Sequence, residues 1–195
     1  MNVAVLSNQD QTSQKALELF VERGFATVGM RELASHLGVA AGSIYYHIDS
    51  KQALLREPLE DLYQILLAGN RSRKSARALS ANERLNQLVE WHLGLHRSKS
   101  LHFILAEREA HCLEGEHKDS VDHLRLSYEE LILRLLTELV GPSPAPELAT
   151  LANSIVSLLN NVPHCLKNTQ LSHDAMRQLV LGFIQSLIRT FTGTR

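Results

Sequence analysis

The sequence has few of the features that mark secreted or membrane-spanning proteins. Its 195 residues include only two cysteines and five prolines. Cys112 and Cys165 form no CxxC pair and do not resemble a disulfide framework, so we expect both to be reduced. Residues 1–6 lack a positively charged segment followed by an apolar run, and no stretch approaches the roughly 18 apolar residues that span a bilayer. We therefore expect a cytoplasmic protein without a membrane partner.

Positive charge is also scarce. The chain carries 20 Lys and Arg residues against 21 Asp and Glu residues, which gives a net charge of −1. Residues 1–55 alone hold four basic and five acidic side chains. This balance gives no general attraction to a polyanion, so binding to a nucleic acid would depend on a few placed cations.

Signatures of catalysis are missing as well. The sequence has no nucleophile elbow, no glycine-rich phosphate loop and no paired catalytic motif, so we expect neither an enzyme nor a cofactor. Ten histidines leave an alternative open, which is a small helical enzyme or a metal-responsive regulator that uses the His-rich segment 92–117. No tight ligand spacing recurs there, which favours scattered surface and helix-end histidines.

Helical periodicity is what the sequence does have. Leucines, alanines and charged residues recur at spacings of three and four, and no Asn-Gly or Asp-Gly pair stands between alternating apolar residues. The pattern predicts an all-α protein of about nine helices. Their expected ranges are 8–23, 30–36 and 40–47, then helices from 51 and from 81, and finally 100–111, 116–140, 146–161 and 172–191.

Local signals mark several helix boundaries. Ser80 and Glu83 form a capping box, and Ser50 is a suitable N-cap. Pro58 lies inside the helix that follows Ser50, where it predicts a kink or a break because proline removes one backbone hydrogen bond. A second break is expected at Val162–Pro163.

Residues 16–55 carry an ordered set of landmarks around two short helices joined at Gly38. The landmarks are Ala16-Leu17-Glu18-Leu19-Phe20, Glu22-Arg23-Gly24-Phe25, Arg31-Glu32-Leu33-Ala34, Leu37-Gly38-Val39, Gly42-Ser43-Ile44-Tyr45-Tyr46-His47 and Ser50-Lys51. With them, the segment resembles the TetR family of transcriptional repressors. The resemblance implies an N-terminal three-helix helix-turn-helix domain that binds DNA, residues 1–50, and a helical domain for ligand binding and dimerisation, residues 51–195.

The start of the expected third helix is built for close approach to DNA. A recognition helix enters the major groove by its N-terminal end, where small side chains are needed. Residues 40–42, Ala-Ala-Gly, meet that need. Ser43 can hydrogen-bond a base edge or a phosphate.

The resemblance also implies roles for the residues that follow. Tyr45 and His47 are expected to contact backbone phosphates, and Tyr46 is the expected contact to bases. Lys51 resembles the family's phosphate contact at a helix N-terminus. The expected DNA-binding residues are Ala41, Gly42, Ser43, Tyr45, Tyr46, His47 and Lys51.

Three positions depart from the family pattern. Ala40 replaces the usual Ser or Thr cap, Ala41 replaces a frequent lysine, and Gly29 stands where a hydroxyl residue usually caps the second helix. A glycine cap costs only a few tenths of a kcal/mol, whereas alanine at a cap costs about 1 kcal/mol. Fewer DNA contacts are therefore expected than is usual for the family.

The apolar face of residues 172–191 is wider than one neighbouring helix needs, which indicates a homodimer interface with the preceding helix. The residues expected there are Leu151, Ile155, Leu158, Leu159, Met176, Leu179, Val180, Phe183, Ile184 and Leu187. The resemblance implies a ligand pocket in the same domain. The residues expected to line it are Leu62, Trp91, Leu95, Phe103, Glu107 and Tyr128.

These expectations combine into one functional hypothesis. The chain would be a repressor that binds palindromic operator DNA as a homodimer and is released by a small, mostly apolar effector. The stretch Leu158–Pro163 with Leu171-Ser172 also resembles a TetR subgroup that includes acyl-CoA-responsive regulators. It lacks the aromatic residues usual after the asparagine.

Overall fold

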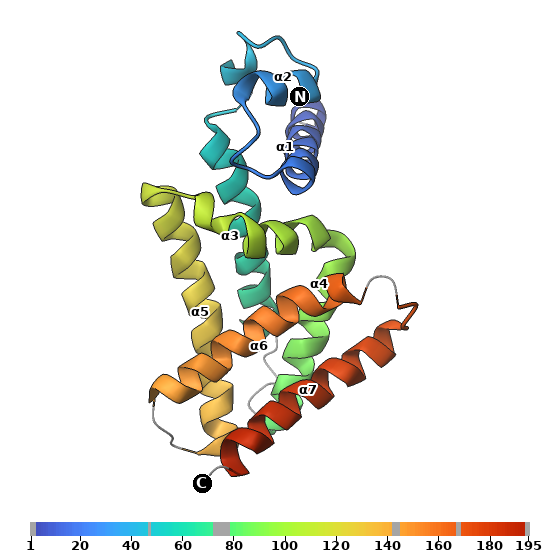
Figure 1. Cartoon of the computed structure of the whole chain (residues 1–195), viewed down its shortest axis with the longest axis vertical. Coiled ribbons are helices and arrows are strands. Elements are labelled where there is room, and N and C mark those ends of the chain that lie inside the picture. The colour runs from blue at the N-terminus through green and yellow to red at the C-terminus, as the bar shows by residue number, and fades with distance from the viewer. Residues whose placement is uncertain (1–2, 47, 72–78, 142–144, 167–168, 194–195) are drawn as a thin grey trace. The chain divides into compact units, whose positions relative to one another are not determined.

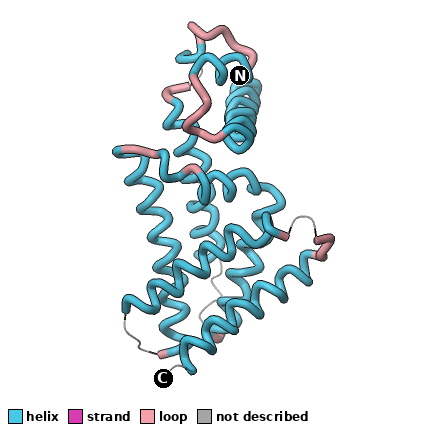
Figure 2. The backbone as a smooth tube through the Cα atoms, viewed as in Figure 1, coloured by secondary structure: helices cyan, strands magenta, loops and turns pink. Residues whose placement is uncertain are grey.

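The computed structural model of the chain describes residues 3–46, 48–71, 79–141, 145–166 and 169–193. Within these ranges the protein is helical, with short loops and no strand (Figures 1 and 2). The α-helices are α1 (Val3–Arg23), α2 (Met30–Leu37), α3 (Lys51–Arg71), α4 (Ala81–Arg108), α5 (Gly115–Val140), α6 (Ala145–Cys165) and α7 (His173–Gly193). Two short 3₁₀ helices, η1 (Ile44–Tyr46) and η3 (Ala110–Cys112), complete the described elements. The all-α expectation is confirmed.

The chain forms two compact units. The first comprises residues 1–62 and 101–122, and the second comprises residues 63–100 and 123–195. Helices α3, α4 and α5 each contribute to both units. None of the described helices combines the length and apolar character needed to span a lipid bilayer.

Two of the predicted boundaries are confirmed by hydrogen bonds. The Ser80 N–H donates to the Glu83 carboxylate at 2.8 Å, and the Glu83 N–H donates to the Ser80 hydroxyl at 3.3 Å, as a capping box requires. Ser50 caps α3 by accepting from the Ala53 N–H at 2.9 Å.

The expected separate helix from residue 100 is the second part of α4. Lys99 has non-helical φ and ψ of −122° and 24°, so α4 is kinked one residue before the predicted start. The following segment, from Leu101, belongs to the first compact unit. The predicted boundary was therefore close, although the chain stays helical on both sides of it.

Other boundaries were wrong. About nine α-helices were predicted, and the described residues contain seven. The difference arises because α4 joins two predicted helices and the predicted helix 40–47 is not α-helical. α1 starts at Val3, five residues before the expected start. α3 continues through Pro58, and α6 continues through Pro163 to Cys165. Prolines that lie within a long apolar helix can be accommodated when tertiary packing offsets the lost hydrogen bond.

The second unit has its own core along α5 and α6. Val121, at the end of the first unit, begins an apolar stripe on α5 that continues with Tyr128, Ile132 and Leu135 in the second unit, and all four are buried. α6 contributes a matching set of buried residues, which are Leu148, Leu151, Ala152, Ile155, Val156 and Leu159. Spacings of three and four put each set on one helix face, which explains why these segments are helical and packed.

Candidate nucleic-acid interface

The helix-turn-helix begins with a sharp turn after α1. Gly24 has φ +87°, a left-handed conformation that favours glycine, and its N–H donates to the Phe20 carbonyl at 2.9 Å. The turn brings Phe25 back onto Phe20, with ring centroids 5.1 Å apart in an edge-to-face arrangement. This aromatic pair fixes where α2 starts relative to α1.

α2 has the weak N-terminal cap that the sequence predicts. Gly29 is the N-cap and makes no side-chain hydrogen bond to the helix. At the other end, Gly38 has φ +75° and closes α2 with backbone hydrogen bonds to Ala34 and Ser35. Leu33 and Ala34 are buried, which anchors the helix in the unit.

The predicted third helix of the helix-turn-helix is wrong in its form. Residues 41–43 make a turn, and only Ile44–Tyr46 form a 3₁₀ helix. The Ser43 N–H and hydroxyl both donate to the Ala40 carbonyl at 2.9 Å, a local side-chain-to-backbone bond that closes the turn. The Ser43 hydroxyl is thus engaged within the protein.

The 3₁₀ turn separates buried from exposed side chains. Ile44 is fully buried and anchors the segment, whereas Tyr45 is 65% exposed and Tyr46 is 88% exposed. Ala41 and Gly42 are also exposed. A large aromatic side chain that is this exposed has no packing role, so both tyrosines are available to a partner. His47 lies outside the described residues.

Lys51 opens α3 beside the aromatic pair. Its Nζ lies 4.2 Å from the centroid of the Phe25 ring, a cation–π arrangement. Burial lowers the pKa of Lys51, and the nearby Cys112 and Glu109 partly oppose this effect. The ammonium is therefore partly desolvated and held over Phe25 rather than extended into solvent.

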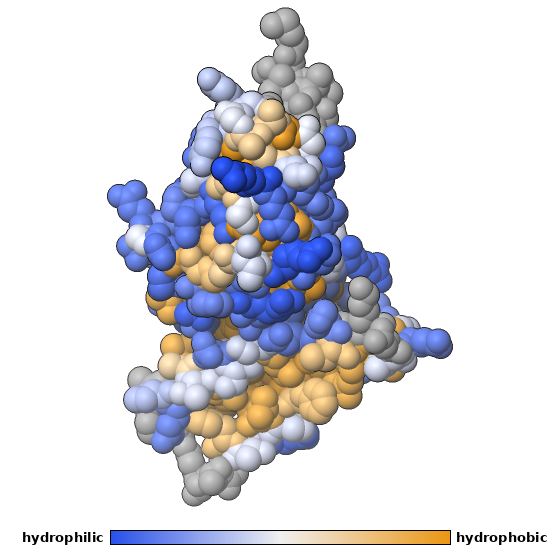
Figure 3. Space-filling view, turned by 45° about the horizontal axis from the view of Figure 1, so that its top comes forward, coloured by the Kyte–Doolittle hydropathy of each residue, from blue (hydrophilic) through white to orange (hydrophobic). Residues whose placement is uncertain are grey.

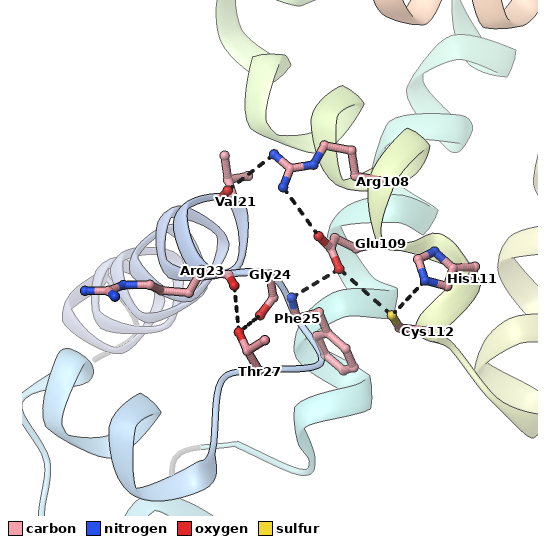
Figure 4. Close-up of polar contacts among 9 residues, drawn as sticks. All are labelled: Val21, Arg23, Gly24, Phe25, Thr27, Arg108, Glu109, His111 and Cys112. Carbon is pink, nitrogen blue, oxygen red and sulfur yellow. Dashed lines mark hydrogen bonds and ion pairs between the residues drawn. The ribbon is translucent and has the colours of Figure 1, made fainter.

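One buried carboxylate in this unit was missed by the sequence reasoning. Glu109 is buried at the end of α4 and accepts a hydrogen bond of 3.1 Å from the Phe25 N–H, 84 residues earlier (Figure 4). Arg108 lies beside it, with Nη2 3.9 Å from Glu109 Oε1 and Nη1 3.5 Å from the Val21 carbonyl. No local pattern in the sequence marks Glu109, because the contact is long-range.

The segment after α4 is also tied to α3. Gln52 donates from Nε2 to the Cys112 carbonyl at 2.9 Å. The Cys112 thiol lies 3.5 Å from His111 Nε2 and 3.9 Å from the Glu109 carboxylate. Burial and the Glu109 charge raise the pKa of Cys112, so the group is a neutral thiol near neutral pH.

The expected ligand-binding residues divide between the two units. Leu62, Phe103 and Glu107 belong to the first unit, where Leu62 and Phe103 are buried and Glu107 is exposed. Trp91, Leu95 and Tyr128 belong to the second unit. There Trp91 and Leu95 are half-buried, Tyr128 is buried, and the Trp91 N–H donates to the Ile65 carbonyl at 3.3 Å.

A buried polar cluster surrounds Tyr128 in the second unit. His92 is fully buried, with Nδ1 2.9 Å from the Tyr128 hydroxyl, and His96 Nε2 donates to the Leu159 carbonyl at 3.1 Å. Burial and the neighbouring His96 hold the pKa of His92 well below its usual value, although Asn160 raises it. Burial lowers the pKa of His96 to about 4, despite the bond to Leu159. Both imidazoles are neutral near pH 7.

The histidines of segment 92–117 thus have separate surroundings rather than a common centre. Among the described residues, no three His, Cys, Asp or Glu side chains come close enough together to hold a metal ion. His92 is fully buried and His96 half-buried in the second unit, whereas His111 is exposed in the first.

The residues expected at the dimer interface fall into two groups, one buried within the chain and one exposed or half-buried. Leu151, Ile155, Leu159, Val180 and Ile184 are buried within the chain itself. The remaining apolar residues are exposed or half-buried, and they are Leu158, Met176, Leu179, Phe183 and Leu187. Figure 3 shows a broad hydrophobic area on the lower part of the molecule, where α6 and α7 lie in Figure 1. α7 therefore carries a second apolar face that the described part of this chain leaves uncovered.

Comparison with known proteins finds two family models that match this chain. Residues 14–57 match the model of the bacterial regulatory proteins of the tetR family, and residues 78–165 match a tetracyclin repressor-like C-terminal domain. The chain is 28% identical over 129 residues to the HTH-type transcriptional repressor KstR2 of Rhodococcus jostii (strain RHA1). That match covers 62% of this chain and 59% of the relative, so the chain spans less than two thirds of this relative's length.

Solved structures agree over nearly the whole fold. A TetR-family transcriptional regulator from Bordetella parapertussis 12822 gives a TM-score of 0.79 at 15% identity, covering 90% of this chain and 93% of that one. AibR, solved in complex with isovaleryl coenzyme A and operator DNA, gives a TM-score of 0.73 at 18% identity, covering 91% and 97%. At these identities the likeness shows the fold.

Proposed function

Because the chain belongs to the TetR family of bacterial regulatory proteins, we propose that it is a ligand-responsive repressor that binds palindromic operator DNA as a homodimer. The observation that carries the proposal is the exposed edge formed by Ala41, Gly42, Tyr45 and Tyr46, with Lys51 beginning the next helix. Exposed aromatic hydroxyls beside small residues suit close contact with a DNA groove.

The enzyme interpretation of segment 92–117 is wrong. Both family models and the relatives matched are transcription regulators, so the chain is a DNA-binding regulator. The two histidines of the second unit have a structural explanation, since His92 hydrogen-bonds to the Tyr128 hydroxyl and His96 to the Leu159 carbonyl.

The composition of the recognition segment predicts how bases are distinguished. Residues 40–50 contain no Lys, Arg, Asn or Gln. These are the side chains that make paired hydrogen bonds to guanine or adenine in the major groove, whereas small apolar groups contact the thymine methyl. We therefore expect Ala40 and Ala41 to select thymines, Tyr46 to contact a base edge, and Tyr45 and His47 to contact phosphates.

The second unit supports the homodimer and the effector. Leu179, Phe183 and Leu187 give α7 exposed apolar surface of the kind that a twofold dimer would bury. The buried Tyr128 hydroxyl and His92 imidazole supply neutral hydrogen-bonding groups inside the second unit. A small, mostly apolar effector with few polar groups fits that chemistry better than an anion.

The proposal is tested by a mobility shift with DNA from upstream of the chain's own gene. We expect a salt-sensitive shift that requires a palindrome and carries two chains per site. A thermal-shift screen over apolar drugs, steroids, flavonoids and acyl-CoA thioesters then identifies the effector, which must also release the DNA. A shift that is the same for any DNA sequence would contradict the repressor assignment.

A further inference from the structure

Glu109 makes a contact that reaches into the helix-turn-helix from far along the chain. Its carboxylate is buried and accepts the Phe25 N–H at 3.1 Å (Figure 4). Phe25 is the first residue after the Gly24 turn, so this hydrogen bond holds the loop that leads into α2. A buried backbone N–H without an acceptor is unfavourable, so Glu109 is needed where it lies.

Phe25, whose N–H donates to Glu109, also forms the cation–π contact with Lys51. The Lys51 Nζ lies 4.2 Å above the Phe25 ring, and the negative charge of Glu109 acts on the same ammonium. Cys112 is a neutral thiol near neutral pH, since its pKa is raised. Cys112 and Glu109 both act to raise the Lys51 pKa, and Glu109 is the carboxylate of the two. Arg108, with Nη2 3.9 Å from the other carboxylate oxygen, partly balances that charge.

We propose that Glu109 is a positioning residue for DNA binding: it fixes the Phe25 ring beneath Lys51 and acts as the internal counter-charge that a DNA phosphate must replace. The inference rests on the proposed role of Lys51 as a phosphate contact. Glu109 itself is buried and does not touch DNA. Its hydrogen bond favours binding by placing Lys51, whereas its charge opposes binding by competing with the phosphate.

Two substitutions at one position separate these effects. In Glu109→Gln the amide carbonyl can still accept the Phe25 N–H, but the charge is gone. We expect operator binding about fivefold tighter at low salt, because a like charge near the phosphate is removed, and a gain that fades as salt increases. In Glu109→Ala the acceptor is lost as well, so binding becomes weaker than in Glu109→Gln.

The matched controls are Glu116→Gln and Lys51→Ala. Glu116 is an exposed carboxylate in the first turn of α5, so neutralising it changes net charge by the same amount away from Lys51. We expect it to leave operator affinity within about twofold of the wild type. In a Lys51→Ala background, Glu109→Gln should give no tightening.

A measurement without DNA keeps the inference independent of the operator. In an NMR titration of the Lys51 side chain, Glu109→Gln should lower the Lys51 pKa relative to the wild type, and Glu116→Gln should not. Hydrogen exchange of the Phe25 amide should be faster in Glu109→Ala than in Glu109→Gln. Circular dichroism checks that each variant is folded.

The outcomes are distinct. An unchanged Lys51 pKa in Glu109→Gln, or equal tightening with and without Lys51, overturns the inference. Wild-type protein that binds no palindrome overturns the proposed function, while the NMR result still decides whether Glu109 acts on Lys51. If Lys51→Ala binds operator as tightly as the wild type, the phosphate role fails and the positioning role for DNA fails with it.

Discussion

Gly69 and Trp91 lie so close in the second unit that a Cβ at residue 69 would overlap the indole ring. The Trp91 N–H donates to the Ile65 carbonyl, one turn before Gly69, so the ring is held against the backbone of α3. The absence of a side chain at residue 69 is thus what allows α3 and α4 to pack at this point.

Gly69→Ala should therefore destabilise the protein. Displacing a rigid indole costs about 1–3 kcal/mol, more than the roughly 1 kcal/mol that alanine gains over glycine within a helix. The melting temperature should fall by a few degrees in differential scanning calorimetry. Gly94→Ala is the matched control, since a Cβ at Gly94 in α4 meets no atom within 4 Å. That variant should be slightly more stable than the wild type, and equal destabilisation of both variants would contradict the packing argument.

Stability should fall as pH drops from about 6.5 toward 4. An unfolded histidine titrates near pH 6.5, whereas the pKa of His96 in the folded chain is lowered to about 4. Above pH 6.5, His96 is neutral in both the folded and the unfolded chain, so its titration does not change the free energy of unfolding. Between pH 6.5 and 4, only the unfolded chain takes up a proton at His96. At pH 5 this lowers the free energy of unfolding by at most about 2 kcal/mol.

Urea unfolding at pH 7.5 and pH 5.0 measures this loss. His96→Gln keeps an N–H donor for the Leu159 carbonyl but does not titrate, so its loss between the two pH values should be smaller. Losses of the same size in both proteins would show that His96 does not titrate as its burial requires.

If the proposed dimer forms through α7, Phe183→Glu should convert it to a monomer. Phe183 is 48% exposed on the uncovered face of α7, and a carboxylate there would be buried without a partner in a dimer. Light scattering after size exclusion at micromolar concentration measures the mass. Leu126→Glu is the control, because Leu126 is 55% exposed on α5 outside that face and should leave the dimer intact. Wild-type protein that is already monomeric would exclude the interface.

Replacing thymine by uracil in the operator should weaken binding at the contacted positions. Uracil lacks only the methyl group, and loss of one buried methyl costs about 0.8 kcal/mol, or roughly fourfold in affinity. Substitution at thymines outside the half-sites serves as the control and should have no effect. If no position in the half-sites responds, residues 40–42 do not contact thymine methyls.

The sequence could predict features that depend on neighbouring residues. Ser80 with Glu83, Ser50 and Gly38 each act within a few residues, and all three boundaries are confirmed. Pro163 was misleading, because α6 continues through it to Cys165 instead of breaking there. Ala40 was noted as a poor cap, but the sequence could not show that the segment would become a 3₁₀ turn.

The parts of the candidate site that could not be predicted are long-range. Glu109 looks like an ordinary acidic residue near a helix end, and only the fold brings it to Phe25. The division of α7 into a buried face with Val180 and Ile184 and an exposed face with Phe183 likewise depends on where α6 lies. The site assignments for DNA, effector and dimer stay predictions.

The most direct test is fluorescence anisotropy with the palindromic operator and a scrambled duplex, measured over a range of salt concentrations. The account predicts that the wild type prefers the palindrome and that affinity for both falls as salt rises. Tyr46→Ala should lose the preference, whereas Lys51→Ala should weaken binding to both duplexes alike and reduce the salt slope by about 1. Equal wild-type affinity for the palindrome and the scrambled duplex at every salt concentration would contradict the account.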